Sequence, residues 1–309
     1  MSNSASSTAG NISPAERAQI QRANVSGLHP VVFVHGLWLL PSSWQRWAEV
    51  FEEAGYIALM PDWPDDPATV AEANANPAVM ANKTVGQVAD HFFAVIAQLE
   101  RKPAVIGHSF GGLLAQLLAG RGLSAVTVAI DPAPFRGVLP LPFSALKAAW
   151  PVLGNPANRS RAVPLSYEQF RYAFANAVGE DEARQLYRTY AVPASGAPLF
   201  QAATANVNPW TEAQVDTLNH ERGPLLIVSG QKDHTAPWAI ANASFRQQQL
   251  NSGLTEIVEM PNRGHSLTID SGWREVADTA LAFVRRFAMA DTFESAYLFS
   301  DEVDRRVAA

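Results

Sequence analysis

The sequence predicts an α/β protein built on a mostly parallel sheet of about six to eight strands, flanked by helices. Short apolar runs that end in a turn alternate along the chain with segments whose apolar residues recur at helical spacing. This alternation is typical of a parallel sheet covered by helices on both faces. A length of 309 residues allows one large domain or two smaller ones, at about 100–200 residues each.

Six short apolar runs are the expected strands. Each reads as a continuous apolar stretch bounded by turn signals, as buried strands of parallel sheets do. They lie at residues 30–36, 56–61, 104–109, 124–131, 224–230 and 255–261.

Helical patterns flank these runs. The first has Pro14 directly after Ser13, which is a favourable helix start. The second places Trp44, Trp47 and Phe51 on one face at helical spacing. The expected helices are residues 13–24, 42–55, 84–101, 110–120 and 272–288.

The strand pattern pauses between Asp131 and Pro224, in a stretch rich in proline and aromatic residues. We interpret residues 134–222, the helical insertion, as several short helices without a strand. They are expected to form a cap, because open α/β sheets bind ligands at the carboxyl ends of their strands. A separate small helical domain is the alternative. The core then comprises residues 13–133 and 223–290, with a C-terminal extension at 291–309.

Composition narrows the function classes. The net charge of −6 and the absence of a basic run argue against a nucleic-acid partner. The lack of cysteine excludes disulfides and thiolate metal sites. Residues 1–12 are small and polar and read as a disordered leader, not as a signal peptide, and no apolar run is long enough to span a membrane. These features favour a cytoplasmic protein.

Ser109 is the first candidate catalytic residue. It lies between Gly107 and Gly111, where an expected strand meets an expected helix. A serine at such a sharp strand-to-helix turn is the arrangement of a nucleophile elbow, and Gly112 lets the helix pack close to the sheet. The unpaired N–H groups at the helix start suit a developing negative charge. A simple helix cap is the alternative role for this serine.

A serine hydroxyl needs a base, and the base needs an orienting acid. Asp233 follows one expected strand, and His265 follows the next, 32 residues later. The ends of neighbouring parallel strands lie at the same edge of a sheet, so these two side chains are expected to meet there. Asp131, at another strand end, is an alternative acid or a supporting residue.

Other histidines fit other roles. His108 and His234 are adjacent to the candidate residues, and His108 is expected to point back into the core. No histidine pair has metal-ligand spacing, so no metal site is expected. A G-x-G-x-x-G fingerprint is absent, and no cofactor is expected.

The motifs HGLW (35–38), GHSFGG (107–112), GQKDHTAP (230–237) and NRGHS (262–266) resemble those of α/β-hydrolase-fold serine hydrolases. The resemblance covers about residues 30–288 and is weakest in the helical insertion. It implies a Ser109–His265–Asp233 triad. It also implies an oxyanion hole formed by the backbone N–H groups of Leu37 and Phe110, with His35 supporting the loop.

The chain departs from the family pattern in two places. The polar, alanine-rich stretch at 61–83 is unusually long, and loops of this length are often lids or disordered. No β-hairpin precedes the strand at 30–36, which favours a sheet nearer six strands than eight.

The resemblance implies hydrolysis of carboxylic esters or lactones through an acyl-enzyme, in an esterase, lipase or lactonase. Acyl transfer, perhydrolysis, C–C bond hydrolysis and a ligand-binding receptor are the alternatives. The substrate is expected to be a small, hydrophobic molecule, and the oligomeric state is left open. The expected pocket residues are Trp38, Trp63, Trp150, Leu199, Phe200 and Trp238.

Overall fold

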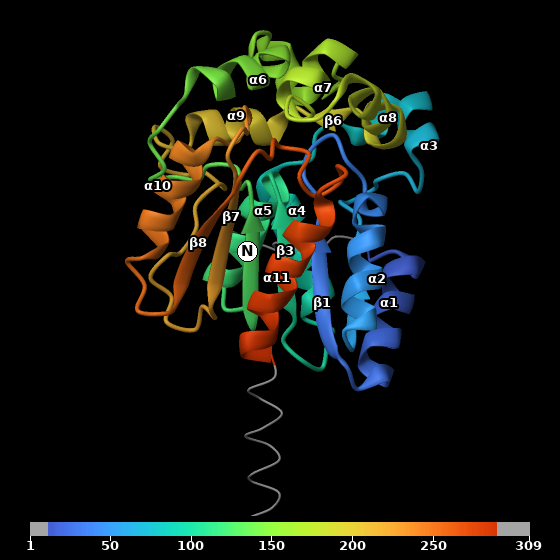
Figure 1. The fold of residues 1–309 in the computed structure, drawn as a ribbon, viewed down its shortest axis with the longest axis vertical. Helices are drawn as coiled ribbons and strands as arrows, with labels where there is room; N and C mark the ends of the chain where they lie inside the picture. The colour runs from blue at the N-terminus through green and yellow to red at the C-terminus, as the bar shows by residue number, and fades with distance from the viewer. Residues whose placement is uncertain (1–11, 289–309) are drawn as a thin grey trace, which may run out of the picture.

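The computed structural model describes residues 12–288. The expected leader, except its last residue, and the expected extension at 291–309 lie outside the described residues. The described chain forms a six-stranded parallel sheet in the order β2-β1-β3-β4-β7-β8 (Figure 1). The strands are β1 (His29–Val34), β2 (Tyr56–Leu59), β3 (Ala104–His108), β4 (Val126–Ile130), β7 (Leu225–Gly230) and β8 (Thr255–Met260).

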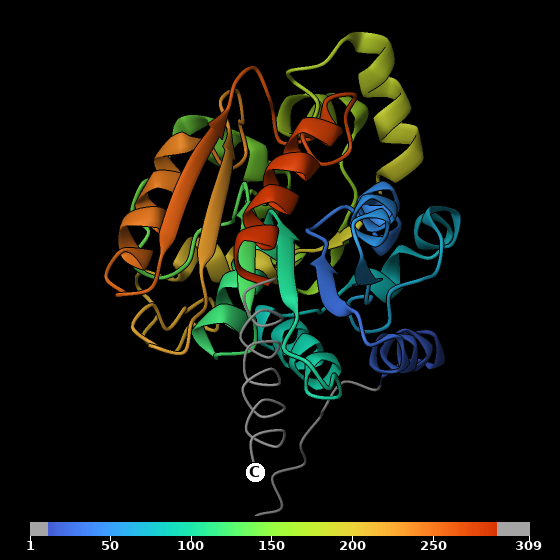
Figure 2. The same ribbon diagram turned by 60° about the horizontal axis from the view of Figure 1, so that its bottom comes forward.

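Helices cover both faces of this sheet, as the alternating pattern predicts. On one face lie α2 (Gln45–Glu53), with the 3₁₀ turn η1 (Pro41–Trp44) before it, and α11 (Trp273–Ala288). On the other face lie α4 (Val85–Ile96) and α5 (Phe110–Gly120), with α1 (Pro14–Ser26) and α10 (Trp238–Gln248) toward the two edges. Figure 2 shows α4 and α11 on opposite sides of the strands.

Local sequence signals explain the element boundaries. Ser13 and Glu16 form a capping box at the start of α1, with each side chain bonded to the backbone N–H of the other. The aromatic face of η1 and α2 packs on Phe33 of β1, whose ring lies 5.2 Å from that of Trp44 and 5.4 Å from that of Phe51. Helix α4 is shorter than the expected 84–101, because the chain tightens into turns after Ile96.

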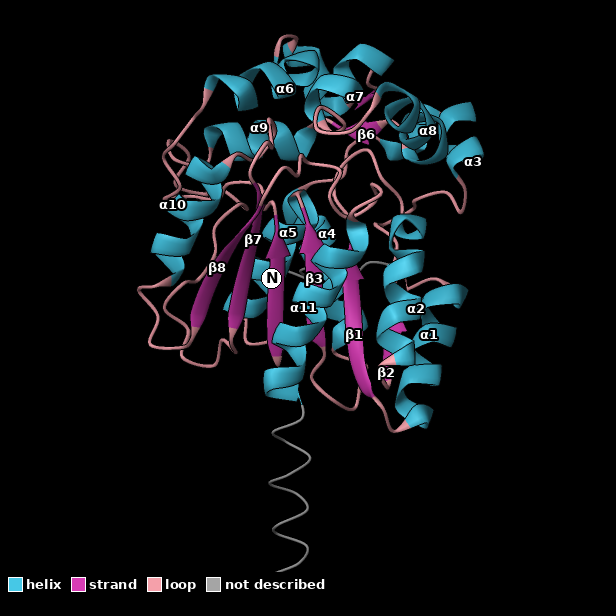
Figure 3. Cartoon of the chain, viewed as in Figure 1, coloured by secondary structure: helices cyan, strands magenta, loops and turns pink. Residues whose placement is uncertain are grey.

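The helical insertion lies across the carboxyl ends of the strands, toward which the strand arrows point (Figure 3). Its helices are α6 (Phe143–Leu153), η3 (Pro156–Ser160), α7 (Tyr167–Ala173), α8 (Glu180–Tyr190) and α9 (Ala197–Thr204). The expectation of no strand was wrong, because β5 (Ala162–Val163) and β6 (Ala194–Ser195) pair antiparallel. Pairs of two residues each leave too short a pattern to recognise in sequence.

The long stretch at 61–83 is ordered in the structure. It contains α3 (Val70–Ala75), which begins at a capping box formed by Thr69 and Glu72, and the 3₁₀ turn η2 (Pro77–Met80). No helix in residues 12–288 is both long and apolar enough to cross a membrane.

Candidate active site

Ser109 occupies a strained turn between β3 and α5. Its φ of 59° lies in the left-handed region that residues with a side chain rarely adopt. The turn is held by its own backbone, since Ser109 N–H donates to Ile130 O and Ser109 O accepts from Gly112 N–H and Ala133 N–H, all at 2.9–3.0 Å. Strain fixed by surrounding hydrogen bonds keeps the hydroxyl at the carboxyl edge of the sheet.

The flanking glycines are required by close backbone approach. A Cβ on Gly107 would lie 1.9 Å from Gly111 O, and one on Gly111 would lie 2.0 Å from Val34 O. No side chain fits at either position, so the first turn of α5 can pass directly beside β1 and β3. This explains the G-x-S-x-G pattern in steric terms.

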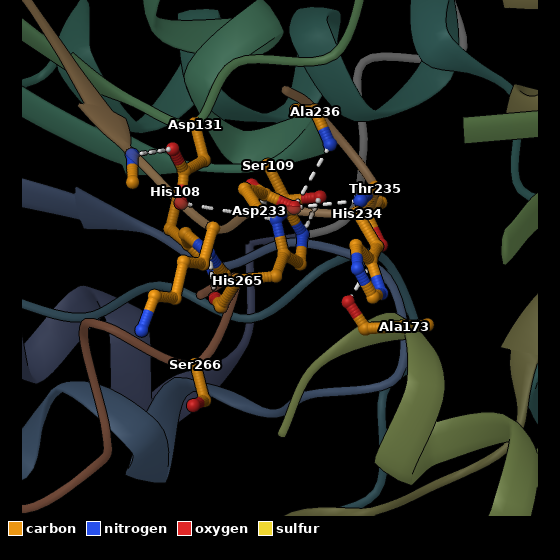
Figure 4. A network of polar contacts seen from close by, with 12 residues as sticks. His108, Ser109, Asp131, Ala173, Asp233, His234, Thr235, Ala236, His265 and Ser266 are labelled. Atoms are coloured by element: carbon orange, nitrogen blue, oxygen red, sulfur yellow. Dashed lines mark hydrogen bonds and ion pairs between the residues drawn. The ribbon is translucent and has the colours of Figure 1, made fainter. Parts of the chain in front are cut away.

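The structure brings Ser109, His265 and Asp233 into one hydrogen-bonded row (Figure 4). His265 Nε2 lies 3.0 Å from Ser109 Oγ, and His265 Nδ1 lies 2.6 Å from Asp233 Oδ2. All three residues are buried. The three residues come from the loops after β3, β7 and β8, so parallel strand ends bring together positions that are distant in sequence.

Asp233 is fixed as an anion. Its Oδ1 accepts from the backbone N–H groups of Thr235 at 2.6 Å and Ala236 at 3.0 Å. Burial acts to raise the pKa of Asp233, but the charge and hydrogen bond of His265 outweigh it, so the pKa lies below its usual value. The imidazole therefore has a charged partner that holds Nδ1.

Asp131, the alternative acid, lies next to this row. Its Oδ2 is 3.9 Å from His265 Nδ1, while its Oδ1 accepts from Gly230 N–H at 2.7 Å. Burial and the nearby charge of Asp233 raise the pKa of Asp131 well above its usual value. Two buried carboxyl groups thus face the imidazole of His265, and only Asp233 is within hydrogen-bond distance of its Nδ1.

His108 points away from Ser109 into the core, as expected. Its Nε2 hydrogen-bonds His265 O at 2.9 Å, and the two rings lie 4.7 Å apart. Burial lowers the pKa of His108 well below its usual value, so the ring is neutral. This histidine supports the loop that carries His265.

Among the residues that the structure describes, one group has metal-ligating atoms close together. His108, Asp131 and His265 offer ligand atoms within 4.8 Å of one another. Both ring nitrogens of His265 and Nε2 of His108 are already hydrogen-bonded within the protein. The donor set therefore fits a proton-transfer row better than an ion site.

The loop after β1 passes beside the nucleophile turn. A Cβ on Gly36 would lie 2.8 Å from Ser109 Cβ and 3.4 Å from Phe110 N. Leu37 follows Gly36 in this loop, and Phe110 is the first residue of α5. The loop that carries Leu37 therefore passes beside the nucleophile turn, and the N–H of Phe110 is one of the unpaired groups of a helix start.

A buried charged network lies behind this loop, and sequence reasoning missed it. Lys83 forms an ion pair with Asp66, and His35 Nε2 lies 3.4 Å from the same carboxylate. Trp63 donates its indole N–H to His35 O at 3.2 Å and stacks on the His35 ring. Asp66 and Lys83 lie in a polar stretch of sequence, where charged side chains usually face water. No local pattern therefore indicates that they are buried as a pair.

An apolar cavity of about 160 Å³ opens beside Ser109, between the core and the helical insertion. No charged side chain of residues 12–288 lines it. Its polar side chains besides Ser109 are bonded within the protein, since Asn206 contacts Gly137 and Val138 and Thr235 contacts Ala173. The Ser109 hydroxyl, which contacts His265 Nε2 at 3.0 Å, therefore lies in an otherwise apolar wall.

Two of the six expected pocket residues, Trp38 and Leu199, line this cavity, and the other four do not. Trp63 is buried behind the loop after β1, where it stacks on His35. Phe200, which lies on α9, packs against the core. Trp150 and Trp238 are turned outward and are 67% and 37% exposed. Side chains of the same helix point in different directions. The presence of aromatic residues in a segment therefore did not identify which of them line the cavity.

The end of α7 is hydrogen-bonded to the loops of the site. Thr235 Oγ1 donates to Ala173 O at 2.7 Å, Asn176 donates to Lys232 O at 2.7 Å, and Ser266 N–H donates to Phe174 O at 3.0 Å. The Phe174 ring also packs edge-on against His265 at 4.9 Å. The insertion thus packs against the loops of the site, and the His265 side chain is fully buried.

The family model described as the alpha/beta hydrolase family matches residues 31–279. The chain belongs to the alpha/beta hydrolase family. No curated protein matches this alpha/beta hydrolase in sequence.

Solved structures of similar fold accompany this result. A monoacylglycerol lipase from Paleococcus ferrophilus has a TM-score of 0.55 and 18% identity, over 82% of this hydrolase and 93% of the lipase. An extracellular alpha/beta-hydrolase from a Paenibacillus species has a TM-score of 0.59 and 18% identity, over 82% and 98%. A pyrethroid hydrolase from Sphingobium faniae has a TM-score of 0.57 and 15% identity, over 83% and 97%. At these identities the likeness concerns the fold.

Proposed function

We propose that this hydrolase cleaves small, hydrophobic carboxylic esters or lactones through an acyl-enzyme on Ser109. The observation that carries the proposal is the 3.0 Å contact between His265 Nε2 and the hydroxyl of a strained serine at an apolar cavity. His265 takes the Ser109 proton as Oγ attacks the acyl carbonyl. Asp233 holds the imidazole tautomer and stabilises its positive charge.

The tetrahedral intermediate carries a negative oxygen that needs donors. The backbone N–H groups of Leu37 and Phe110 are assigned this role. The close approach of Gly36, which precedes Leu37, to Ser109 and the start of α5 at Phe110 support the assignment. Each preorganised donor of this kind contributes about 10²–10³ in rate. His265 then returns its proton to the leaving alcohol and activates a water that cleaves the acyl-enzyme.

The cavity wall supports an apolar substrate. Burying a charged or hydrogen-bonding group without a partner is costly, and this wall offers no free partner apart from Ser109 among the described residues. Residues 134–222 are assigned as the cap that closes the cavity. The name of the lipase of similar fold supports esters as the first class to test.

The test is labelling and turnover on the purified full chain. We expect a fluorophosphonate to label the chain at Ser109 and p-nitrophenyl esters of apolar acids to be hydrolysed. Ser109→Ala and His265→Ala should each lower kcat by a factor of about 10⁴ or more. Ser160→Ala and His220→Ala, at exposed positions, are the matched controls.

Full ester turnover by Ser109→Ala, or no labelling and no turnover by the native chain, would refute the proposal. Adding alcohol or peroxide as the acyl acceptor separates hydrolysis from acyl transfer and perhydrolysis. Ligand binding without turnover would favour the receptor alternative.

A further inference from the structure

Helix α6 has two apolar faces, and one of them is uncovered. Ala145, Ala148 and Val152 are buried against the protein. Phe143, Leu146 and Trp150, at positions i, i+3 and i+7, share the opposite face and are 79%, 38% and 67% exposed. Helix α6 lies at the outer surface of the insertion, far from the end of α11 (Figure 1).

This exposed face continues to the mouth of the cavity. Leu139 and Leu141, just before α6, are 74% and 64% exposed, and both line the cavity together with Leu146. Next to them, Asn206 accepts from Gly137 N–H at 2.7 Å, which places the exposed residues after α9 beside this edge. The apolar collar, as we call this surface, comprises Leu139, Leu141, Phe143, Leu146, Trp150, Val207 and Trp210.

The segment that carries five of the seven collar residues is charged oppositely to the whole chain. The stretch 132–161 contains four cations and no Asp or Glu, although the protein carries a net charge of −6. The four cations are Arg136, Lys147, Arg159 and Arg161, all exposed. None of them forms an ion pair with a carboxylate within residues 12–288.

From this combination we infer that the apolar collar docks on an anionic phospholipid surface, with the cavity mouth facing the lipid. Exposed aromatic and leucine side chains bordered by Lys and Arg are the features by which helices lie in a lipid interface. Contiguous exposed apolar surface marks an interaction site in a monomeric protein. Each cation near an anionic surface adds to the attraction.

The same charges disfavour a second copy of this chain as the occupant. A two-fold dimer through the collar would bring the same patch from each copy together. Four cations without a carboxylate partner would then approach four more, with no acidic residue in 132–161 to compensate. An anionic phospholipid surface can bury the apolar side chains of the collar and attract the four cations beside it.

The inference is tested by sedimentation of the full chain with vesicles. One set is pure phosphatidylcholine, and the other is equal parts phosphatidylcholine and phosphatidylglycerol. We expect binding to the anionic vesicles, weaker binding to the neutral ones, and loss of anionic binding as salt increases. R159Q/R161Q should weaken anionic binding by about 20- to 30-fold, and F143S/W150S by about tenfold or more.

Matched controls alter the same residue types elsewhere. R17Q/K102Q removes two exposed cations outside the insertion, and V25S/L250S removes two exposed apolar side chains outside the collar. These variants should bind vesicles like the native chain. All variants should retain turnover of a water-soluble ester, because none of the altered residues lines the cavity.

Several outcomes would overturn the docking inference. These are absence of vesicle binding, equal binding to neutral and anionic vesicles, or equal losses in the control variants. A stable dimer in light scattering that F143S/W150S abolishes would assign the collar to a second copy. Ser109→Ala should bind vesicles normally, so failure of the proposed function and failure of the docking surface are distinguishable.

Discussion

Asp131 and Asp233 share one imidazole but sit in different environments. Asp233 receives two backbone N–H groups and His265, whereas Asp131 receives the N–H of Gly230. Hydrogen bonds to a carboxylate favour the charged form, and burial with a like charge nearby favours the neutral form. The pair is thus divided into Asp233, whose pKa is lowered and which holds His265, and Asp131, whose pKa is raised.

This division gives a prediction for activity. Asp233→Asn should lower kcat on a p-nitrophenyl ester by about 10⁴, because the amide favours the wrong tautomer of the imidazole. Asp131→Asn should cost no more than about tenfold, since the new amide oxygen can still accept from Gly230 and the side chain stays neutral. Steady-state kinetics on both variants is the measurement. An equal or larger loss in Asp131→Asn would make Asp131 the orienting acid.

The raised pKa of Asp131 also predicts that the free energy of unfolding depends on pH. Its folded pKa lies well above 3.8, so above pH 3.8 the unfolded chain loses this proton while the folded chain keeps it. The folded state then binds more protons, and this residue lowers stability as pH rises through that window. Asp131→Asn removes the effect, so its stability relative to the native chain should increase from about pH 4 toward neutrality.

Thermal unfolding of both proteins across that pH range is the measurement. Asp65→Asn, at an exposed position in the stretch 61–83, is the control and should run parallel to the native chain. Parallel curves for Asp131→Asn would contradict the raised pKa.

The stretch between β2 and α4 supports the loop after β1. Trp63 and Asp66 both contact His35, and Lys83 completes the network. The backbone of Lys83 is itself held by Ser195 of β6. The Ser195 hydroxyl accepts from the N–H of Lys83 and donates to the carbonyl of Lys83, both at 3.1 Å. This segment therefore connects the helical insertion to the loop after β1.

Removing one charged side chain from this network should lower the free energy of unfolding. Lys83→Met leaves the Asp66 carboxylate, whose side chain is 1% exposed, without its partner. Loss of one member of a buried pair costs about 3–5 kcal/mol. We expect that decrease in the free energy of unfolding, measured in urea, with a lower kcat as the loop loosens.

The double variant D66N/K83M is the control, because it removes both charges together. It should be more stable than Lys83→Met alone, since no unpaired charge remains buried. If the single and double variants were equally destabilised, the pairing would contribute nothing.

The substrate cavity belongs to the molecule as a whole, because core and insertion each supply part of its wall. Ser109, Phe110 and Ile240 come from the core, and Leu153 and Ala202 come from helices of the insertion. Many of the insertion residues in the wall are alanines, so the space exists because these side chains are short. On the proposed function, we therefore expect side chains of the insertion to limit which acyl groups fit.

Ala202→Phe should shorten the preferred acyl chain. The ring would fill part of the cavity, so kcat/KM for long-chain p-nitrophenyl esters should fall by about 10- to 200-fold while short esters are little affected. Ala202→Ser, which keeps the size of the side chain, is the control. A uniform loss over all chain lengths would argue that this wall does not contact the acyl group.

The fold and the reactive row could be predicted because their signals are local. Each buried strand and the turn that follows it lie within a short stretch of sequence. Because the strands pair in parallel, their carboxyl ends lie at one edge of the sheet. Ser109, Asp233 and His265 each followed an expected strand, so their meeting could be inferred without coordinates. The steric need for Gly107 and Gly111 is also visible as a short motif.

Other features depended on contacts between segments far apart in sequence. The burial of Asp66 with Lys83, the stacking of Trp63 on His35 and the β5–β6 pair are of this kind. The outward turn of Trp150 is another, since its pattern fits a buried or an exposed helix face equally well. A periodic pattern says that a face is apolar, but packing in three dimensions decides whether that face lines a cavity, fills the core or meets the solvent.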